Sequence, residues 1–231
     1  MAITATLRHS NIDSANKNNP AQYITSSFTT TAGKSIIVYI GNGSNAGTPG
    51  TVTLTKTGVS FSSIRTNGQS ERRLSAFLGE VSSTNTGTMT IDIASAANQC
   101  HDHVVELDGH DTVGTVVQNQ TNQGTGTSLT VTLDNSPNSA NAILGGFYVN
   151  ESPATDILPG AGFVELVETE DSTPQSTVMS EVDTTAGGTA VSASWVQSTA
   201  AIGIAMELKA LAAAASRPFR RSVPRFFPRM R

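Results

Sequence analysis

The stretch from Thr51 to Ile64, Thr-Val-Thr-Leu-Thr-Lys-Thr-Gly-Val-Ser-Phe-Ser-Ser-Ile, alternates between small polar and apolar side chains for much of its length. Successive side chains of a β-strand point to opposite faces of a sheet, so this alternation is typical of strands with one buried and one wet face. Gly58 interrupts the pattern where a turn is expected. The stretch therefore predicts two short β-strands rather than an amphipathic helix.

Similar runs recur from Tyr23 to Lys209, each bounded by Gly, Asn, Ser or Pro. The clearest of the others span residues 35–40, 74–78, 88–93, 104–107, 128–133, 142–149, 162–167, 176–182, 191–195 and 201–208. About a dozen strands without intervening helical patterns predict an all-β fold, a two-sheet antiparallel β-sandwich of jelly-roll type. The polar stretch 118–126, Gln-Asn-Gln-Thr-Asn-Gln-Gly-Thr-Gly, is interpreted as a surface loop.

The composition fits this fold class. Only 14% of residues are charged and 5% aromatic, which suits short strands joined by polar turns better than amphipathic helices. The single cysteine, Cys100, excludes an intramolecular disulfide and is compatible with a cytoplasmic origin. The first residues lack a basic stretch followed by an apolar run, and no window approaches the roughly 18 apolar residues of a membrane span. We therefore expect neither a signal peptide nor a membrane partner.

The chain of 231 residues is long enough for one large β-domain. We expect an N-terminal segment over residues 1–20, the β-sandwich domain over 21–210, and an alanine linker with a C-terminal arm over 211–231. Prolines at positions 218, 224 and 228 exclude a regular helix or a central strand in the arm. The arm is therefore expected to be extended or irregular.

Charge separates the arm from the rest of the chain. The net charge is −4, but residues 1–216 carry 8 basic and 18 acidic residues, or −10, whereas the remaining residues carry six arginines, or +6. Arginine and aromatic side chains dominate many protein interfaces. The residues expected to bind a partner are Arg217, Phe219, Arg220, Arg221, Arg225, Phe226, Phe227, Arg229 and Arg231.

Three kinds of partner fit such an arm. Guanidinium and apolar groups suit the surface of another protein in an assembly. Arginine and aromatic side chains also bind the phosphates and bases of nucleic acid, which the acidic body would repel, so nucleic acid is expected to be reached only through the arm. The third kind of partner is the acidic body of another copy of the chain, which the arm could bind by charge complementarity. A homo-oligomer is therefore expected.

Three segments carry a resemblance to a known family. They are Phe28-Thr-Thr-Thr-Ala-Gly-Lys-Ser-Ile-Ile-Val-Tyr-Ile-Gly, Val104-Val-Glu-Leu-Asp-Gly, and the closing run from Trp195 to Lys209. In their order the chain resembles a jelly-roll-like β-sandwich family of structural proteins common in phage virions and prophages, over roughly residues 20 to 210. The resemblance implies a β-sandwich with a structural role, and it implies no catalytic residues.

The tetrapeptide Cys100-His-Asp-His departs from that family's pattern and is the most site-like cluster. On a strand His101 and His103 project to one face and Cys100 and Asp102 to the other, so the two imidazoles could ligate a metal. No second ligand pair at suitable spacing accompanies them. We therefore expect no metal or other cofactor, and interpret the histidines as polar side chains on an exposed sheet face or at a protomer contact. Asp108, His110 and Asp111 follow in the next turn.

Two further patterns are incomplete. The segment from Thr29 to Ser35 ends like a phosphate-binding loop, but Phe28 stands where that loop needs glycine and a strand pattern follows it. An acidic run could hold calcium or supply the two carboxylates of a glycosidase, but it is interpreted as a solvated strand end and loop. Its members are Glu165, Glu168, Glu170 and Asp171.

Aromatic residues and nucleophiles give no positive sign of an active site. Most of the four candidate aromatic residues lie in apolar runs and are expected in the core rather than stacked on sugar rings. They are Tyr23, Tyr39, Tyr148 and Trp195. The chain also lacks a Gly-x-Ser-x-Gly nucleophile elbow. We therefore expect that it is not an enzyme.

These patterns together predict a structural protein of a tailed-phage virion, made in the host cytoplasm and located in the virion. A compact sandwich with an arm suits a capsid decoration or cement protein that docks on capsid subunits. The sequence shows neither the repeats nor the heptads of a trimeric fibre. A tail or baseplate-associated structural or adaptor protein and a glycan-binding host-recognition module are the alternatives left open.

Overall fold

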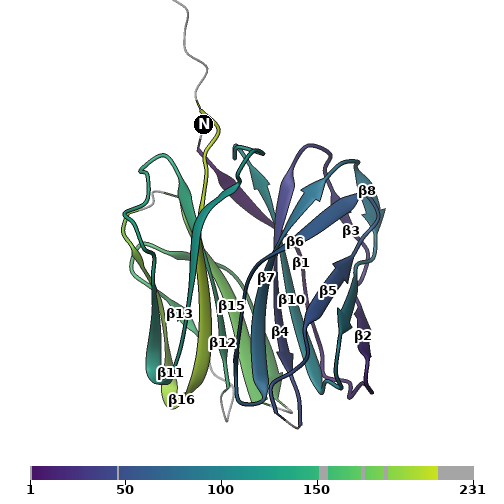
Figure 1. The fold of residues 1–231 in the computed structure, drawn as a ribbon. Helices are drawn as coiled ribbons and strands as arrows, with labels where there is room; N and C mark the ends of the chain where they lie inside the picture. Colours follow the sequence, from purple (N-terminus) through teal and green to yellow (C-terminus); the bar gives the residue numbers. More distant parts are fainter. Residues whose placement is uncertain (1, 46, 151–155, 173–174, 185–186, 213–231) are drawn as a thin grey trace, which may run out of the picture.

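The computed structural model describes residues 2–45, 47–150, 156–172, 175–184 and 187–212 (Figure 1). Every regular element within these residues is a β-strand. All pairs of named strands are antiparallel. The prediction of an all-β, antiparallel fold is therefore confirmed. A search of the described residues for a helix able to cross a membrane finds none.

Ten strands from the first half of the chain pair only with one another. They are β1 (Thr4–Asp13), β2 (Ala21–Ile24), β3 (Phe28–Thr30), β4 (Ser35–Gly43), β5 (Val52–Thr55), β6 (Val59–Gln69), β7 (Arg72–Val81), β8 (Asn85–Gly87), β9 (Thr90–Ile93) and β10 (Gln99–Asp108). A five-stranded sheet has the order β1-β10-β4-β7-β6, and a three-stranded sheet has the order β2-β9-β5. The pair β3-β8 continues the β2-β9 pair along the chain.

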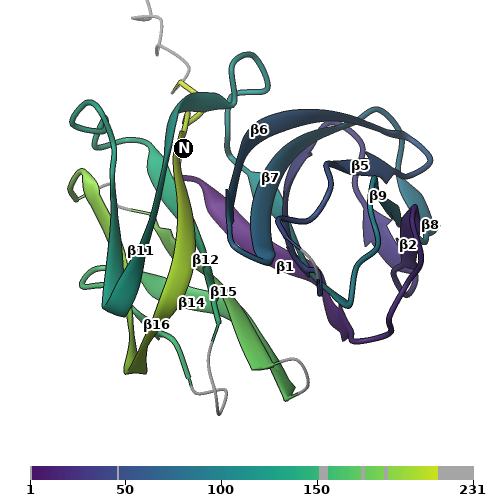
Figure 2. The ribbon, with the colours of Figure 1, turned by 60° about the horizontal axis from the view of Figure 1, so that its bottom comes forward.

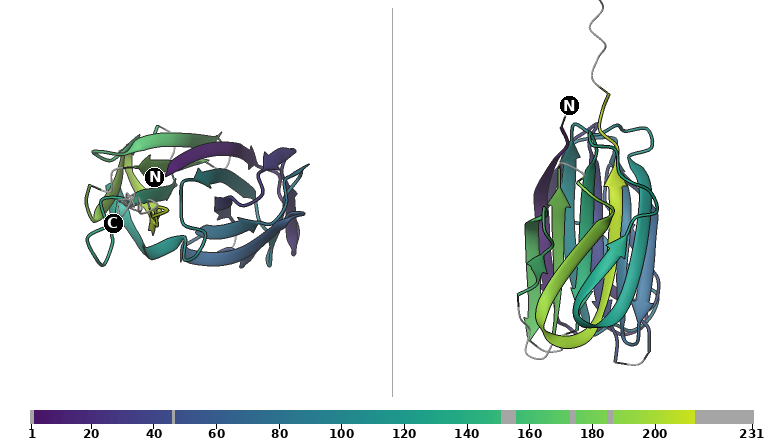
Figure 3. Two further views of the ribbon diagram at one scale, coloured as in Figure 1. Left: turned by 90° about the horizontal axis from the view of Figure 1, so that it is seen from above. Right: turned by 90° about the vertical axis from the view of Figure 1, so that its left-hand side faces the viewer.

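The second half of the chain forms one six-stranded sheet. Its strands are β11 (Val116–Thr132), β12 (Ala142–Val149), β13 (Leu158–Pro159), β14 (Val164–Ser172), β15 (Gln175–Asp183) and β16 (Ala190–Leu208). The order is β11-β16-β12-β15-β14, and β13 pairs with β16. Figure 2 shows the two sets of strands side by side, and Figure 3 shows that most strands run along the long axis of the molecule.

Apolar side chains fill the spaces between the sheets. Tyr23 and Ile91 of the three-stranded sheet pack with Val38 and Val104 on one face of the five-stranded sheet. Tyr39, Val105 and Leu107 on its other face pack against the six-stranded sheet, where their partners include Leu144, Tyr148, Val178, Ile202 and Ile204. The central strands β4 and β10 are therefore buried on both faces, which explains why nearly every residue in them is buried.

A third apolar cluster covers the far face of the six-stranded sheet. The ladder between β11 and β16 shifts register at Gly126–Ser128, so that residues 116–126 pair with 199–208 and residues 128–132 pair with 190–194. Such a bulge bends a strand pair. Beyond the bend, Leu129, Val131 and Trp195 pack in one cluster with Phe147 and Met179 of the central strands.

Two expectations about the polar parts of the sequence are wrong. The N-terminal segment was expected over residues 1–20, outside the β-sandwich domain, but its residues 4–13 form β1, which pairs with β10 along its whole length at an edge of the five-stranded sheet. Residues 118–126 were expected in a surface loop, but they lie in β11 and pair with the apolar end of β16. Their polar side chains bond across the sheets, as Gln120 does with Arg65 (2.9 Å).

Candidate functional site

The arm expected to bind a partner lies outside the described residues. The residues concerned are Arg217, Phe219, Arg220, Arg221, Arg225, Phe226, Phe227, Arg229 and Arg231. The described chain ends at Ala212, beside an open groove of about 650 Å³ whose lining includes Val117, Glu207 and Leu211. At this end Leu211 N donates to Gly109 O, which fixes the last described residues to the loop after β10.

The histidines of β10 point to the same side, as the alternation along the strand predicts. His101 contacts Thr169 Oγ1 through Nδ1 (2.9 Å) and Ser176 Oγ through Nε2 (3.0 Å). His103 contacts Ser180 Oγ through Nδ1 (2.8 Å) and the same Thr169 Oγ1 through Nε2 (2.9 Å). All four ring nitrogens are thus bonded to hydroxyls of β14 and β15.

The expectation that these histidines lie on an exposed face is wrong, because β14 and β15 cover that face of β10. Both side chains are fully buried. Burial lowers the pKa of His101 to about 3, with a smaller effect of the Arg72 charge, and burial likewise lowers the pKa of His103 to about 3. Both rings are therefore neutral at physiological pH and have no access to solvent. The arrangement fixes two sheets together rather than exposing a base to a ligand.

The opposite face of the same strand carries Cys100 and Asp102. Cys100 is buried in the cluster between the five- and three-stranded sheets, and burial raises the pKa of its thiol. Asp102 Oδ1 lies 3.1 Å from His9 Nε2 without the geometry of a hydrogen bond, and the His9 ring stacks on Phe28. Across the described part of the chain, no group of three His, Cys, Asp or Glu is placed to hold a metal ion.

The residues just beyond β10 bond elsewhere. His110 is buried and its Nε2 lies 2.9 Å from Ser35 Oγ, while Asp111 pairs with Lys209 Nζ at 2.8 Å. Asp108 pairs with Lys34. Each of these groups ties the turn after β10 to a neighbouring segment, and none of these contacts reaches His101.

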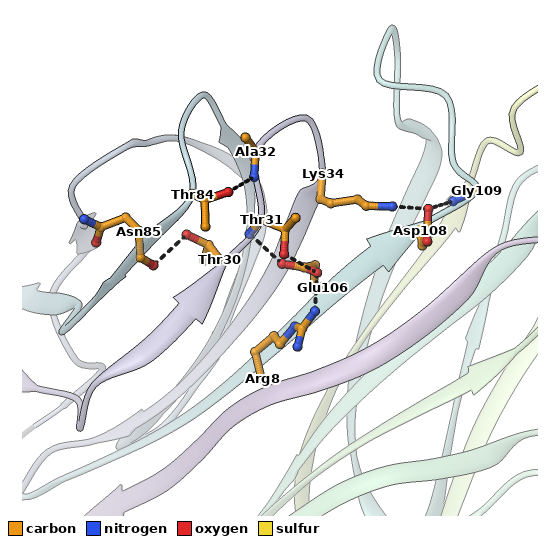
Figure 4. A network of polar contacts seen from close by, with 10 residues as sticks. All are labelled: Arg8, Thr30, Thr31, Ala32, Lys34, Thr84, Asn85, Glu106, Asp108 and Gly109. Atoms are coloured by element: carbon orange, nitrogen blue, oxygen red, sulfur yellow. Dashed lines mark hydrogen bonds and ion pairs between the residues drawn. The ribbon is translucent and has the colours of Figure 1, made fainter.

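The segment that resembles a phosphate-binding loop is a turn between β3 and β4 (Figure 4). Glu106 occupies it from within: its carboxylate accepts from Thr31 N (2.9 Å), from Thr31 Oγ1 (3.2 Å) and from Arg8 Nη2 (2.5 Å). Gly33 has a φ of +76°, which an L side chain rarely adopts. The backbone N–H of Thr31, which a phosphate would need, already serves an internal carboxylate.

The acidic run lies on β14, the edge strand of the six-stranded sheet. Glu165 and Glu170 are exposed, Glu168 is partly buried, and Asp171 is buried where it accepts from Ser14 Oγ (2.6 Å). Burial raises the pKa of Glu168 to about 7, helped by its carboxylate neighbours and opposed by a hydrogen bond from Ile157 N. The interpretation as a solvated strand end and loop therefore holds for Glu165 and Glu170 and is wrong for Glu168 and Asp171.

Glu181 is a buried carboxyl that the sequence did not mark. It lies in β15 opposite Glu165, and one oxygen accepts from Gly160 N (3.2 Å) while the other has no partner. Burial raises its pKa to about 8. The one available signal was the alternation of β15, which places Glu181 with Met179 on the face of the third apolar cluster.

Replacing Glu181 by Gln should remove a pH dependence. The folded pKa of about 8 exceeds the ordinary value of 4.5, so the wild type loses stability as the pH rises between these values. Urea unfolding from pH 5 to 9 should show E181Q gaining on the wild type by about 1.4 kcal/mol per pH unit up to pH 8. The matched control E80Q, at an exposed position, should run parallel to the wild type. Parallel curves for E181Q would show that this carboxyl ionises normally.

The four candidate aromatic residues are all buried, as expected for core positions: Tyr23, Tyr39, Tyr148 and Trp195. Trp195 Nε1 donates to Gly126 O (2.8 Å) at the bend of the long hairpin.

Comparison with known proteins gives no match to a family model, a curated protein or a solved structure.

Proposed function

We propose that this chain is a structural, non-catalytic protein of a tailed-phage virion, a capsid decoration or cement protein that binds capsid subunits through its C-terminal arm. The family resemblance of the strand segments supports the virion assignment. The side chains that looked most like a functional site, His101 and His103, are buried in contacts between two sheets. This supports a structural role, because these contacts stabilise the body of the protein.

The distribution of cations is the observation that carries the docking role of the arm. Seven of the eight Lys and Arg side chains of the body have internal partners. Four form ion pairs, Arg8, Lys17, Lys34 and Lys209, and three donate hydrogen bonds, Lys56, Arg65 and Arg72. The positive charge left for a partner is therefore concentrated in the six arginines of the arm. Arginine forks bind surface carboxylates in bidentate fashion, which suits docking on another protein.

We infer further that the jelly-roll-like β-sandwich is built by residues 4–108 rather than by 21–210. Strand order supports this: β1, β10, β4 and β7 are neighbours in one sheet, and β2, β9 and β5 are neighbours in the other. Such an exchange of successive strands between two facing sheets is typical of jelly rolls, which recur in viral capsid proteins. Strands β11 to β16 then form an added layer that carries the arm.

Co-sedimentation with DNA-free capsid shells that lack this protein tests the docking role. The full-length protein should pellet with the shells at low ionic strength. A full-length variant with all six arm arginines replaced by Ser should bind at least about tenfold more weakly, since charge-complementary contacts are lost.

The matched control, K17Q/K209Q, removes two cations from the body and should pellet like the wild type. Equal binding of wild type and arm variant, or binding by neither, would contradict arm-dependent docking. Binding to naked DNA but not to shells would assign the arm to nucleic acid instead.

A further inference from the structure

An acidic surface lies on β14 and the segment before it. Its members, which we call the acidic face, are Asp156, Glu165, Glu168 and Glu170. The bulge between Glu165 and Val167 resets the alternation, so Glu165 lies opposite Glu181 and Glu168 lies opposite Met179 in the ladder with β15. Cross-strand neighbours share a face, and Glu181 and Met179 are on the same side of β15. The carboxylates of β14 therefore point to one side of the sheet.

This acidic face has no compensating cation within the described residues. Each ion pair found there involves an acid elsewhere: Glu106, Asp102, Asp13, Asp108 or Asp111. Burial is the main cause of the raised pKa of Glu168, and the charges of Glu165, Asp156 and Glu170 raise it further. A bound cation would relieve this repulsion between carboxylates.

Two further observations indicate what kind of cation fits. Thr177 lies opposite Glu170, hence on the same face, and its Oγ1 is buried without a hydrogen-bond partner among the described residues. Leu158, two residues after Asp156, is 60% exposed. A compact metal ion would leave this apolar side chain in water, and no metal-binding group is found in the described part of the chain. A segment with both hydrogen-bond donors and apolar side chains matches the surface better.

The C-terminal arm has this composition, since its six arginines alternate with Phe219, Phe226, Phe227 and Met230. We propose that the acidic face binds the arm of a second copy of this chain. This inference rests on the proposed docking role of the arm and identifies a partner for it. Guanidinium groups would lie on Glu165, Glu168 and Glu170, and a phenylalanine ring on Leu158.

The direction of the strands favours a second copy over the same molecule. β16 ends at Leu208, which pairs with Ala142 at the same end of the six-stranded sheet as the pair Val182 and Val164. The acidic face runs from that end back along the sheet. An arm that binds its own face must therefore reverse its direction after the end of β16 at Leu208. Prolines 218, 224 and 228 favour an extended arm, which instead reaches a neighbour.

Sedimentation velocity of the full-length protein over a range of concentrations tests this directly. The wild type should self-associate reversibly at low ionic strength and less at moderate ionic strength. E165K/E170K should weaken association at least about tenfold, and so should R225E/R229E on the arm. A mixture of these two variants should associate again, because the reversed arm matches the reversed face.

The control E71K/E80K reverses two exposed carboxylates outside the acidic face and should associate like the wild type. Far-ultraviolet circular dichroism checks that each variant is folded. The proposal would be overturned by a wild type that is monomeric at every concentration. It would also be overturned if E71K/E80K weakened self-association as much as E165K/E170K, or if the mixture of the two charge-reversed variants failed to associate.

The result is separable from the docking of the arm on capsids. If the wild type self-associates but does not bind capsid shells, the acidic face remains the partner of the arm and the proposed capsid role is wrong. Shell binding by a strictly monomeric wild type would do the reverse.

Discussion

Stability should fall steeply when the pH is lowered below about 4.5, because the fold keeps His101 and His103 neutral. Their folded pKa values of about 3 lie below the ordinary value of 6.5, so the unfolded chain binds protons that the folded chain refuses. Each histidine then lowers the free energy of unfolding by about 1.4 kcal/mol per pH unit between these values. The stability that they contribute is complete above pH 6.5 and is lost on acidification.

Glu168 and Glu181 act in the opposite direction over part of this range. Their folded pKa values of about 7 and about 8 exceed the ordinary value of 4.5, so they favour the folded state increasingly as the pH falls toward 4.5. Between pH 4.5 and 6.5 the two effects oppose each other, and we expect a plateau. Below pH 4.5 only the histidines remain of these four groups, so the loss is steep.

Urea unfolding midpoints measured from pH 3 to 9 give this profile. His103→Gln keeps a donor and an acceptor but no longer titrates, so the slope of its acid limb should be about half that of the wild type. His101→Gln should behave alike, and H101Q/H103Q should lose most of the limb. Unchanged slopes in all three variants would show that other groups govern acid unfolding.

Gly146→Ala should destabilise the protein by about 3 kcal/mol, at the upper end for overpacking of a core. Gly146 lies in β12, between β15 and β16, and an added Cβ would stand 2.5 Å from Cε1 and 2.6 Å from Cδ1 of Tyr39. The Tyr39 ring is fully buried, so it has no free space to move into. The measurement is chemical unfolding at neutral pH.

Gly188→Ala is the matched control, because nothing lies within 4 Å of a Cβ built there. It should change stability by less than about 0.5 kcal/mol. A Tyr39→Leu background removes the ring, so Gly146→Ala should be less harmful there than in the wild type. Equal losses in both backgrounds would show that the close approach of β4 and β12 at this point is not the cause.

Apolar alternation predicted the strands that form the core, and it failed for strands whose sequences are polar. β1 reads Thr-Ala-Thr-Leu-Arg-His-Ser-Asn-Ile-Asp and lies at a sheet edge, where few apolar contacts are needed. The first part of β11 is rich in Gln, Asn and Thr because its partners are hydroxyl and amide groups as well as backbone. Local sequence cannot show that the apolar end of β16 will pair with such a segment.

The sequence predicted that His101 and His103 share a face, but not which surface meets that face. β10 is buried on both sides, so its alternation separates two interiors rather than an interior from water. The hydroxyls that receive the imidazoles come from Thr169, Ser176 and Ser180, which are 66 or more positions away in the chain. Contacts of such long range are fixed by the packing of the two halves and carry no local signal.

The acidic face combines predictable and unpredictable parts. Glu165, Glu168 and Glu170 stand out in the sequence as a run, and their place on a strand follows from the apolar residues before them. The bulge that gathers them on one side, the approach of Asp156, and the unpaired Thr177 depend on the ladder with β15 and on the loop beside it. The sequence therefore indicated the charge of this surface but not its shape.

Electron cryomicroscopy of capsid shells mixed with the full-length protein tests the central claim most directly. We predict density for an all-β body on the outer capsid surface, with the contact to capsid subunits made by residues 217–231. Shells mixed with the variant that lacks the six arm arginines should be bare. Density at the tail or baseplate, or a capsid contact made by the body without the arm, would contradict the account.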